Sequence, residues 1–151
     1  MNRTATARIG LLASVLLFSH TVHADAALDA TIMDHVMPRF EQEAREFMAE
    51  SGAQLVSSRW DGDTHTLIAV GDLPPPPAKS LDVAFPASGR APQAPPASDH
   101  VARLCRHPGA AMLAGFMAKH DITMVFVYRH PNTRLAPQVV DIDHTDLGGC
   151  I

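Results

Sequence analysis

The sequence has few aromatic residues, little positive charge and no long apolar run, and each shortage argues against a class of protein. Its 151 residues include six Phe, one Tyr and one Trp, and 12 Lys and Arg stand against 16 Asp and Glu. Without a basic excess the chain has little to neutralise phosphates, so nucleic-acid binding is not expected. No apolar run reaches the roughly 20 residues of a transmembrane helix. The remaining composition, 46% apolar and 19% charged, is that of one globular domain.

Motifs of the common enzyme classes are also missing from the sequence. There is no Gly-x-Ser-x-Gly, no His-Glu-x-x-His, no Gly-rich phosphate loop and no Cys-x-x-Cys. A group of glutamates between residues 41 and 50 follows a helical pattern. A solvated helix face explains that group better than the paired carboxylates of a glycosidase. The sequence therefore predicts neither a catalytic residue nor a cofactor.

The first 24 residues have the form of a signal peptide. Two arginines precede an apolar run over residues 9–18, and the small residues Val22 and Ala24 fit the positions that a signal peptidase reads. We expect cleavage after Ala24, with a second candidate site after Ala26 and an uncleaved N-terminal anchor as the alternative. Cleavage removes two Arg and no acid, which takes the net charge from −4 to −6. The mature chain is expected in the periplasm or secreted, without a transmembrane anchor.

Cys105 and Cys150 are the two cysteines of the chain, and we expect them to form a disulfide bond. An even number of cysteines in an exported protein favours a structural bridge. By the chain-entropy estimate, a bond across the 44 intervening residues stabilises the fold by roughly 4 kcal/mol. The alternative is a reactive Cys105 beside Arg106 and His107, but the sequence marks no orienting group or oxyanion site for such a thiol.

The apolar patterns predict one α+β domain over residues 25–151, in the order α-β-β-loop-α-β-β. A helix over 26–50 is interrupted by Pro38, which implies either a kink or a second helix starting there. The next segment predicts a hairpin about an Asp61-Gly62 turn, with strands at 53–60 and 63–70. That register pairs Val56 with Leu67 and Leu55 with Ile68.

The C-terminal half repeats this order of elements. Residues 98–119 predict helix with a break at 107–109, and residues 122–130 form an apolar strand that should be central in the sheet. Residues 135–143 are its expected partner. We expect an antiparallel sheet with the helices on one face. The mature chain's methionines all follow the apolar patterns and are expected to fill the core: Met33, Met37, Met48, Met112, Met117 and Met124.

Residues 72–97 interrupt the domain with eight of the twelve prolines. Such a density favours polyproline II or a flexible surface loop, so we expect a flexible Pro-rich insert at 72–97. Leu81, Val83 and Phe85 alternate and would add a short edge strand. A ligand for a proline-binding module is the functional alternative.

The densest group of possible metal ligands follows the last strand. It consists of Asp141, Asp143, His144 and Asp146, and it lacks the Gly and terminal Glu of an EF-hand loop. A solvated acidic strand end is the simpler interpretation, so no metal is expected. A periplasmic metal-binding protein using these His and Asp ligands remains the alternative function.

The segment Leu104-Cys105-Arg106-His107-Pro108, the strand containing Tyr128, and the final Cys150 resemble a pattern in small exported Gram-negative bacterial proteins of unknown function. In those proteins a helix bearing a cysteine precedes a Tyr-bearing hairpin and a C-terminal cysteine. The resemblance covers about the last 50 residues and implies an α+β domain with one disulfide. From the residues themselves we expect a non-enzymatic binding or assembly module whose partner is a protein of the cell envelope.

Overall fold

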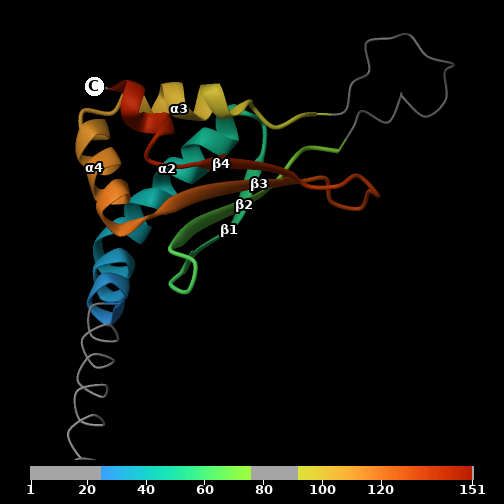
Figure 1. Ribbon diagram of the computed structural model, residues 1–151. Helices are drawn as coiled ribbons and strands as arrows, with labels where there is room; N and C mark the ends of the chain where they lie inside the picture. The colour runs from blue at the N-terminus through green and yellow to red at the C-terminus, as the bar shows by residue number, and fades with distance from the viewer. Residues whose placement is uncertain (1–24, 76–91, 151) are drawn as a thin grey trace, which may run out of the picture.

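The computed structural model describes residues 25–75 and 92–150, which form a four-stranded sheet with its helices on one face (Figure 1). This confirms a single small α+β domain. The expected signal peptide, and the edge strand suggested by Leu81, Val83 and Phe85, lie outside the described residues.

The N-terminal helical segment runs without a break from residue 25 to residue 50. Its middle part is a π-helical turn, η1 (Ile32–Val36), which leads into α2 (Met37–Glu50). Pro38 has no N–H to donate, and the backbone N–H of Met37 reaches back five residues to the carbonyl of Ile32. The proline is therefore accommodated by a wider turn rather than by a separate helix. Gly52, which follows the C-cap residue Ser51, has a φ of 76° and lets the chain turn away from the helix.

The first hairpin consists of β1 (Gln54–Asp61) and β2 (Thr66–Asp72), and its predicted register is wrong. Trp60 pairs with Leu67, and a bulge at Val56 leaves that residue without a partner. The turn spans residues 62–65 rather than two residues. The Asp61 carboxylate accepts hydrogen bonds from the backbone N–H groups of Asp63 and Thr64, which stabilises this longer turn.

The second half contains α3 (Ala97–Cys105), α4 (Ala110–His120), β3 (Thr123–Arg129), β4 (Gln138–Ile142) and the short 3-10 helix η3 (Asp146–Cys150). The break between α3 and α4 falls where His107-Pro108-Gly109 predicts it. Strand β3 is internal in the sheet order β1-β2-β3-β4, as its apolar sequence indicates.

The expectation of a wholly antiparallel sheet is wrong at its centre. β1–β2 and β3–β4 are antiparallel, but β2 and β3 pair in parallel, with Ile68 beside Val125 and Val70 beside Val127. A parallel pair needs a long crossover connection, and residues 73–122, which include α3 and α4, provide it. The sheet is therefore mixed.

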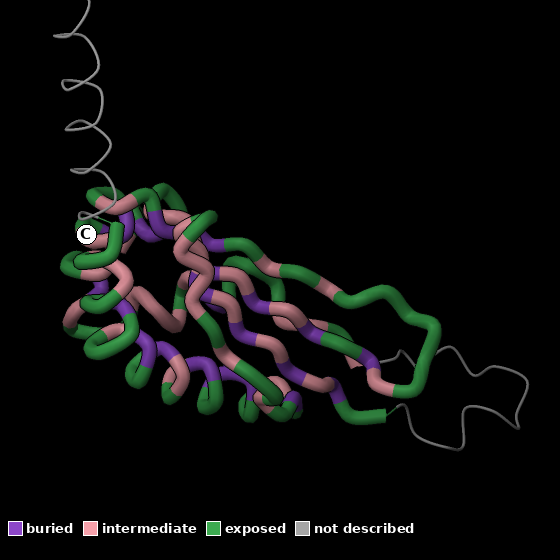
Figure 2. Tube along the Cα trace, turned by 90° about the horizontal axis from the view of Figure 1, so that it is seen from below, coloured by how far each residue is buried: buried purple, intermediate pink, exposed green. Residues whose placement is uncertain are grey.

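The hydrophobic core lies between one face of the sheet and the helices. Along β2 and β3 every second residue is buried, which Figure 2 shows as alternating colours along the strands. Phe126 on β3 meets Phe40 and Phe47 from α2 and His100 from α3, with ring centroids 4.8–6.0 Å apart. Both helices therefore cover the same face. Met37, Met48, Met117 and Met124 are in this core as expected.

Two methionines depart from the predicted core. Met33 is 55% exposed and Met112 is 79% exposed. Each follows the apolar period of its own helix, but each helix buries only the side that meets the sheet or a neighbouring helix. When the apolar stripe of a helix is wider than the surface it packs against, the residues at the edge of the stripe stay exposed to solvent.

Candidate functional site

The sheet face opposite the helices is the main candidate functional surface. We call it the open face and define it by five residues with the same side-chain direction: Ile68, Val70, Val125, Val127 and Val139. They stand in two rows across β2, β3 and β4, because Ile68 is beside Val125, and Val70 is beside Val127, which is beside Val139. Four of them are half-buried and Val139 is 54% exposed.

The open face is apolar although no described helix covers it. All five side chains are β-branched, which suits a pleated surface. In residues 25–75 and 92–150, the aromatic contacts of α2 and α3 reach Phe126, on the opposite face of β3. Strands in parallel pairs are usually apolar on both faces because both faces are covered. Here the described chain covers one face only, and a contiguous exposed apolar patch of this kind typically marks an interaction site.

Charged residues border the open face in a regular arrangement, and we call Arg59, Asp72, Arg129 and Asp141 its charged rim. Arg59 on β1 and Asp141 on β4 stand at the two ends of the row that contains Ile68 and Val125. At the Asp72 end of the strands, Arg129 Nη2 lies 2.8 Å from the Asp72 carboxylate. Arg59 approaches Asp61 only at 3.9 Å. The arginine of each pair is exposed, so these pairs contribute little to folding and the guanidinium charges stay available to a partner.

The predicted disulfide between Cys105 and Cys150 is present, with the Cα atoms 4.9 Å apart. It joins the last residue of α3 to the last residue of η3, and the adjacent Leu147 is fully buried. Both sulfurs are used in the bond, so neither cysteine is a free thiol. The bond thus holds the C-terminus to the helices on the covered side of the sheet.

The acidic group after β4 is used in local turn contacts. The Asp143 carboxylate accepts hydrogen bonds from the side chain and the backbone N–H of Thr145, and these bonds lower the pKa of that carboxyl. The Asp146 carboxylate accepts a bond from the backbone N–H of Asp143. In the described ranges no three His, Cys, Asp or Glu side chains are grouped so that they could hold a metal ion. The structure therefore does not gather Asp141, Asp143, His144 and Asp146 as a ligand set.

A buried polar pair in the core was not foreseen from the sequence. His100 and Tyr128 are both almost fully buried, and His100 Nε2 lies 2.9 Å from the Tyr128 hydroxyl. His100 Nδ1 lies 3.1 Å from the carbonyl of Pro96, which can only accept, so Nδ1 carries the proton and Nε2 accepts from tyrosine. Burial lowers the pKa of His100 and raises the pKa of Tyr128. The signal available in advance was a His on the apolar side of a helix pattern.

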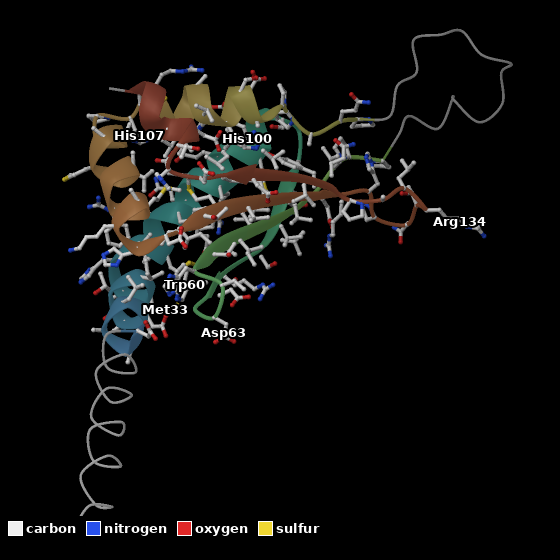
Figure 3. The ribbon with its side chains drawn as sticks, viewed as in Figure 1. Met33, Trp60, Asp63, His100, His107 and Arg134 are labelled. Atoms are coloured by element: carbon white, nitrogen blue, oxygen red, sulfur yellow. A yellow bond between two sulfur atoms is a disulfide. The ribbon has the colours of Figure 1, made fainter. Side chains whose placement is uncertain are left out.

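Figure 3 shows His100 between α3 and the strands, whereas Arg134 lies at the far tip of the β3–β4 connection. The His100–Tyr128 pair connects α3 to β3 inside the core, where the tilted ring of Phe47 packs against the imidazole with the ring centroids 4.1 Å apart. Both partners are neutral and mutually hydrogen-bonded. The pair therefore acts as a satisfied structural link between a helix and the sheet.

A hollow lies where the first hairpin meets the N-terminal helix, near Trp60 and Asp63 in Figure 3. Half of its lining residues are aspartates, and Arg59 lies among them. The Trp60 indole N–H donates to Asp29 at 2.7 Å, and Asp61 accepts from the turn backbone. A side chain at position 62 would collide with the Asp29 carboxylate, so Gly62 permits this close approach. These contacts explain the cluster as an anchor of the helix to the hairpin.

Comparison with known proteins found no relative of this chain. No protein-family model matches the chain, and neither a curated protein nor a solved structure matches it. Among the helices of the described residues, none has the length and apolar character to cross a membrane.

Proposed function

We propose that this chain is an exported, disulfide-bonded binding or assembly module of the bacterial cell envelope, and that it is not an enzyme. A protein surface covers its open face. The observation that carries the proposal is the open face itself: five β-branched apolar residues on the two central strands and β4, with no described helix against them.

Burial energetics supports a protein partner for this face. Full burial of one exposed Val or Ile side chain stabilises a structure by about 1.5–3 kcal/mol. Val139 can gain most of this, and the other four residues, which are already half-buried, gain a part of it. The charges of the open face lie at its rim rather than its centre, as in a protein interface with an apolar core and a polar border. A partner with an apolar surface would gain binding free energy by burying the centre of the open face. The charged rim would make the binding specific.

Site-specific photo-crosslinking in the envelope tests this role. A benzoylphenylalanine at position 139 replaces a side chain that is 54% exposed on the open face, and the matched control at Met112 replaces one that is 79% exposed on α4. We expect a protein adduct from position 139 and none from position 112. Equal adducts from both positions, or none from position 139, would contradict the proposal.

Export itself is tested by the mass of the protein in the envelope fraction. If the N-terminal segment is a signal peptide, the mature protein begins at Asp25, or at Ala27 if the second site is used. Retention of Met1 in the exported fraction would contradict signal cleavage.

A further inference from the structure

We infer that the protein surface that covers the open face is a second copy of this chain, packed sheet against sheet about a two-fold axis parallel to the strands. This inference rests on the proposed function, because it names the partner of the same surface. It follows from the way the charged rim is placed relative to the two apolar rows.

The arrangement of residues across the sheet makes the open face complementary to itself. The first row reads Arg59, Ile68, Val125, Asp141 from β1 to β4. A two-fold axis that runs along the strands, between β2 and β3, places β1 of each copy over β4 of the other. Arg59 then faces Asp141 of the second copy, and Ile68 faces Val125. The symmetry repeats both contacts.

The other rows fit the same operation. In the second row Val70 comes to face Val127 of the second copy, and Ser57 faces Val139. At the end of the strands Asp72 comes to face Arg129 of the second copy. Within one copy these two residues already pair at 2.8 Å, so two copies bring four charges of alternating sign together. The four rim charges thus each meet the opposite sign. Asp61, two residues after Arg59 on the same face, is the exception, because it comes to lie over the acidic end of β4 of the second copy.

The charge pattern also selects this axis over the other face-to-face arrangement. A two-fold axis across the strands, through the first row, would place each strand over its own copy. Arg59 would face Arg59 and Asp141 would face Asp141, which is repulsive on both sides. Packed sheets lie about 10 Å apart and align to within about 30°, so an arginine on one sheet can reach a carboxylate on the other.

The size of the face sets the expected affinity. Four strands at a spacing of about 4.8 Å and three rows at about 6.6 Å intervals give a surface of roughly 15 by 20 Å. Two copies of a surface of this size bury about 600 Å² in total, which is below the about 1,200–2,000 Å² of stable specific interfaces. The dimer should therefore be weak and reversible, with a Kd of about 100 μM.

The experiment is sedimentation analysis of the protein purified after export, between about 1 and 500 μM. We expect a concentration-dependent dimer. Arg59→Asp and Asp141→Arg should each raise the Kd about 10-fold or more, and the double variant should return it to within about three-fold of the original, because both ion pairs are then reversed. Arg39→Asp, with the same charge change on the exposed side of α2, should leave the Kd unchanged.

A second variant tests the apolar residue at the β4 edge of the open face without endangering the fold. Val139→Lys changes a half-exposed side chain, and we expect a folded monomer at every concentration, with circular dichroism unchanged. A chain that stays monomeric to about 500 μM, a dimer indifferent to Val139→Lys, or a double variant no better than the single ones would overturn the second-copy inference.

The outcomes separate this inference from the proposed function. An envelope adduct at position 139 with a different protein, together with a monomeric purified chain, would overturn the second-copy inference and leave the binding role intact. The absence of any adduct at position 139 would remove the binding role as well.

Discussion

The two faces of the central strands have nearly the same apolar content and opposite surroundings. On β3, Phe126 and Tyr128 point into the core, and Val125 and Val127 point away from it. The first pair packs against α2 and α3, whereas no described helix covers the second pair. An apolar strand sequence therefore predicts that both faces of the strand favour burial. It does not predict whether each face is buried by another part of the same chain or by a partner.

Residue type nevertheless distinguishes the two faces. The covered face mixes large and small residues, with Ala69 and Gly71 on β2 beside the large rings of Phe126 and Tyr128 on β3. At Gly71 a Cβ would collide with the sulfur of Met48, so α2 depends on that glycine for its close approach. The apolar residues of the open face are all β-branched. The covered face depends on the fit of large side chains to small ones, and the open face does not.

Truncation of one residue on each face tests most directly whether the two faces differ in burial. Phe126→Ala should lower the free energy of unfolding by about 3–5 kcal/mol, since it removes a ring packed between two helices. Val127→Ala, one residue further on the open face, should cost about 1 kcal/mol or less in the monomer. Urea unfolding at low micromolar concentration measures both. Equal losses would show that the open face is covered within the monomer.

Removing the disulfide tests how far the covered side depends on its tether. Cys150→Ala should lower the free energy of unfolding by about 2–5 kcal/mol, because the unfolded chain is no longer constrained across the intervening loop. Thermal or urea unfolding measures the loss, and a Cys105→Ala, Cys150→Ala double variant should match the single one. A greater stability of the double variant would point to mispairing of the remaining thiol as part of the single variant's loss.

The pH dependence of the free energy of unfolding tests the role of the buried His100 on the covered side of the sheet. Burial holds the pKa of His100 below its ordinary value of 6.5, so between the folded value and 6.5 the unfolded chain binds more protons. The contribution of neutral His100 to the free energy of unfolding is fully present above pH 6.5. It is lost as the pH falls from 6.5 to the lower pKa of His100 in the folded chain. We expect His100→Gln to flatten this part of the stability curve.

The matched control for this titration is His35→Gln, a change at an exposed histidine in the π-helical turn. Its stability curve between about pH 7.5 and 5 should keep the original slope. An unchanged slope in His100→Gln would mean that the buried imidazole does not carry the effect.

The smallest expected effect concerns the segment between β2 and α3. The sequence predicts that this Pro-rich segment is dispensable for folding, and loop closure entropy depends only weakly on length. Replacing residues 76–91 by a short Gly/Ser linker should leave the melting temperature within a few degrees. The replacement keeps Ala94, whose backbone N–H donates to Gln138 at 2.8 Å. A large drop would show that the replaced residues contribute to the core.

Much of the local structure could be read from the amino-acid sequence. The 3.6-residue period gave the N-terminal helix, and Pro108 with Gly109 marked the break between α3 and α4. The run Thr123–Arg129 is apolar enough to identify an internal strand, and two cysteines in one chain suggested their pairing. The helix, the break and the strand each depend on residues that are close together in the chain. The disulfide could be predicted because two cysteines have one possible pairing.

Tertiary structure alone decided the pairing of β2 with β3, the register of the first hairpin and the side on which the helices pack. The Asp61-Gly62 pair favours a two-residue turn locally, but burial of Leu67 and Ala69 together with the Asp61 side-chain contacts gives a longer turn and a bulge at Val56. Similarly, Met112 and Met117 belong to one helical pattern, and only the second lies where the helix meets the core. Local propensities differ by fractions of a kcal/mol, whereas the burial of one large side chain contributes more, so the packing of distant segments determines the outcome.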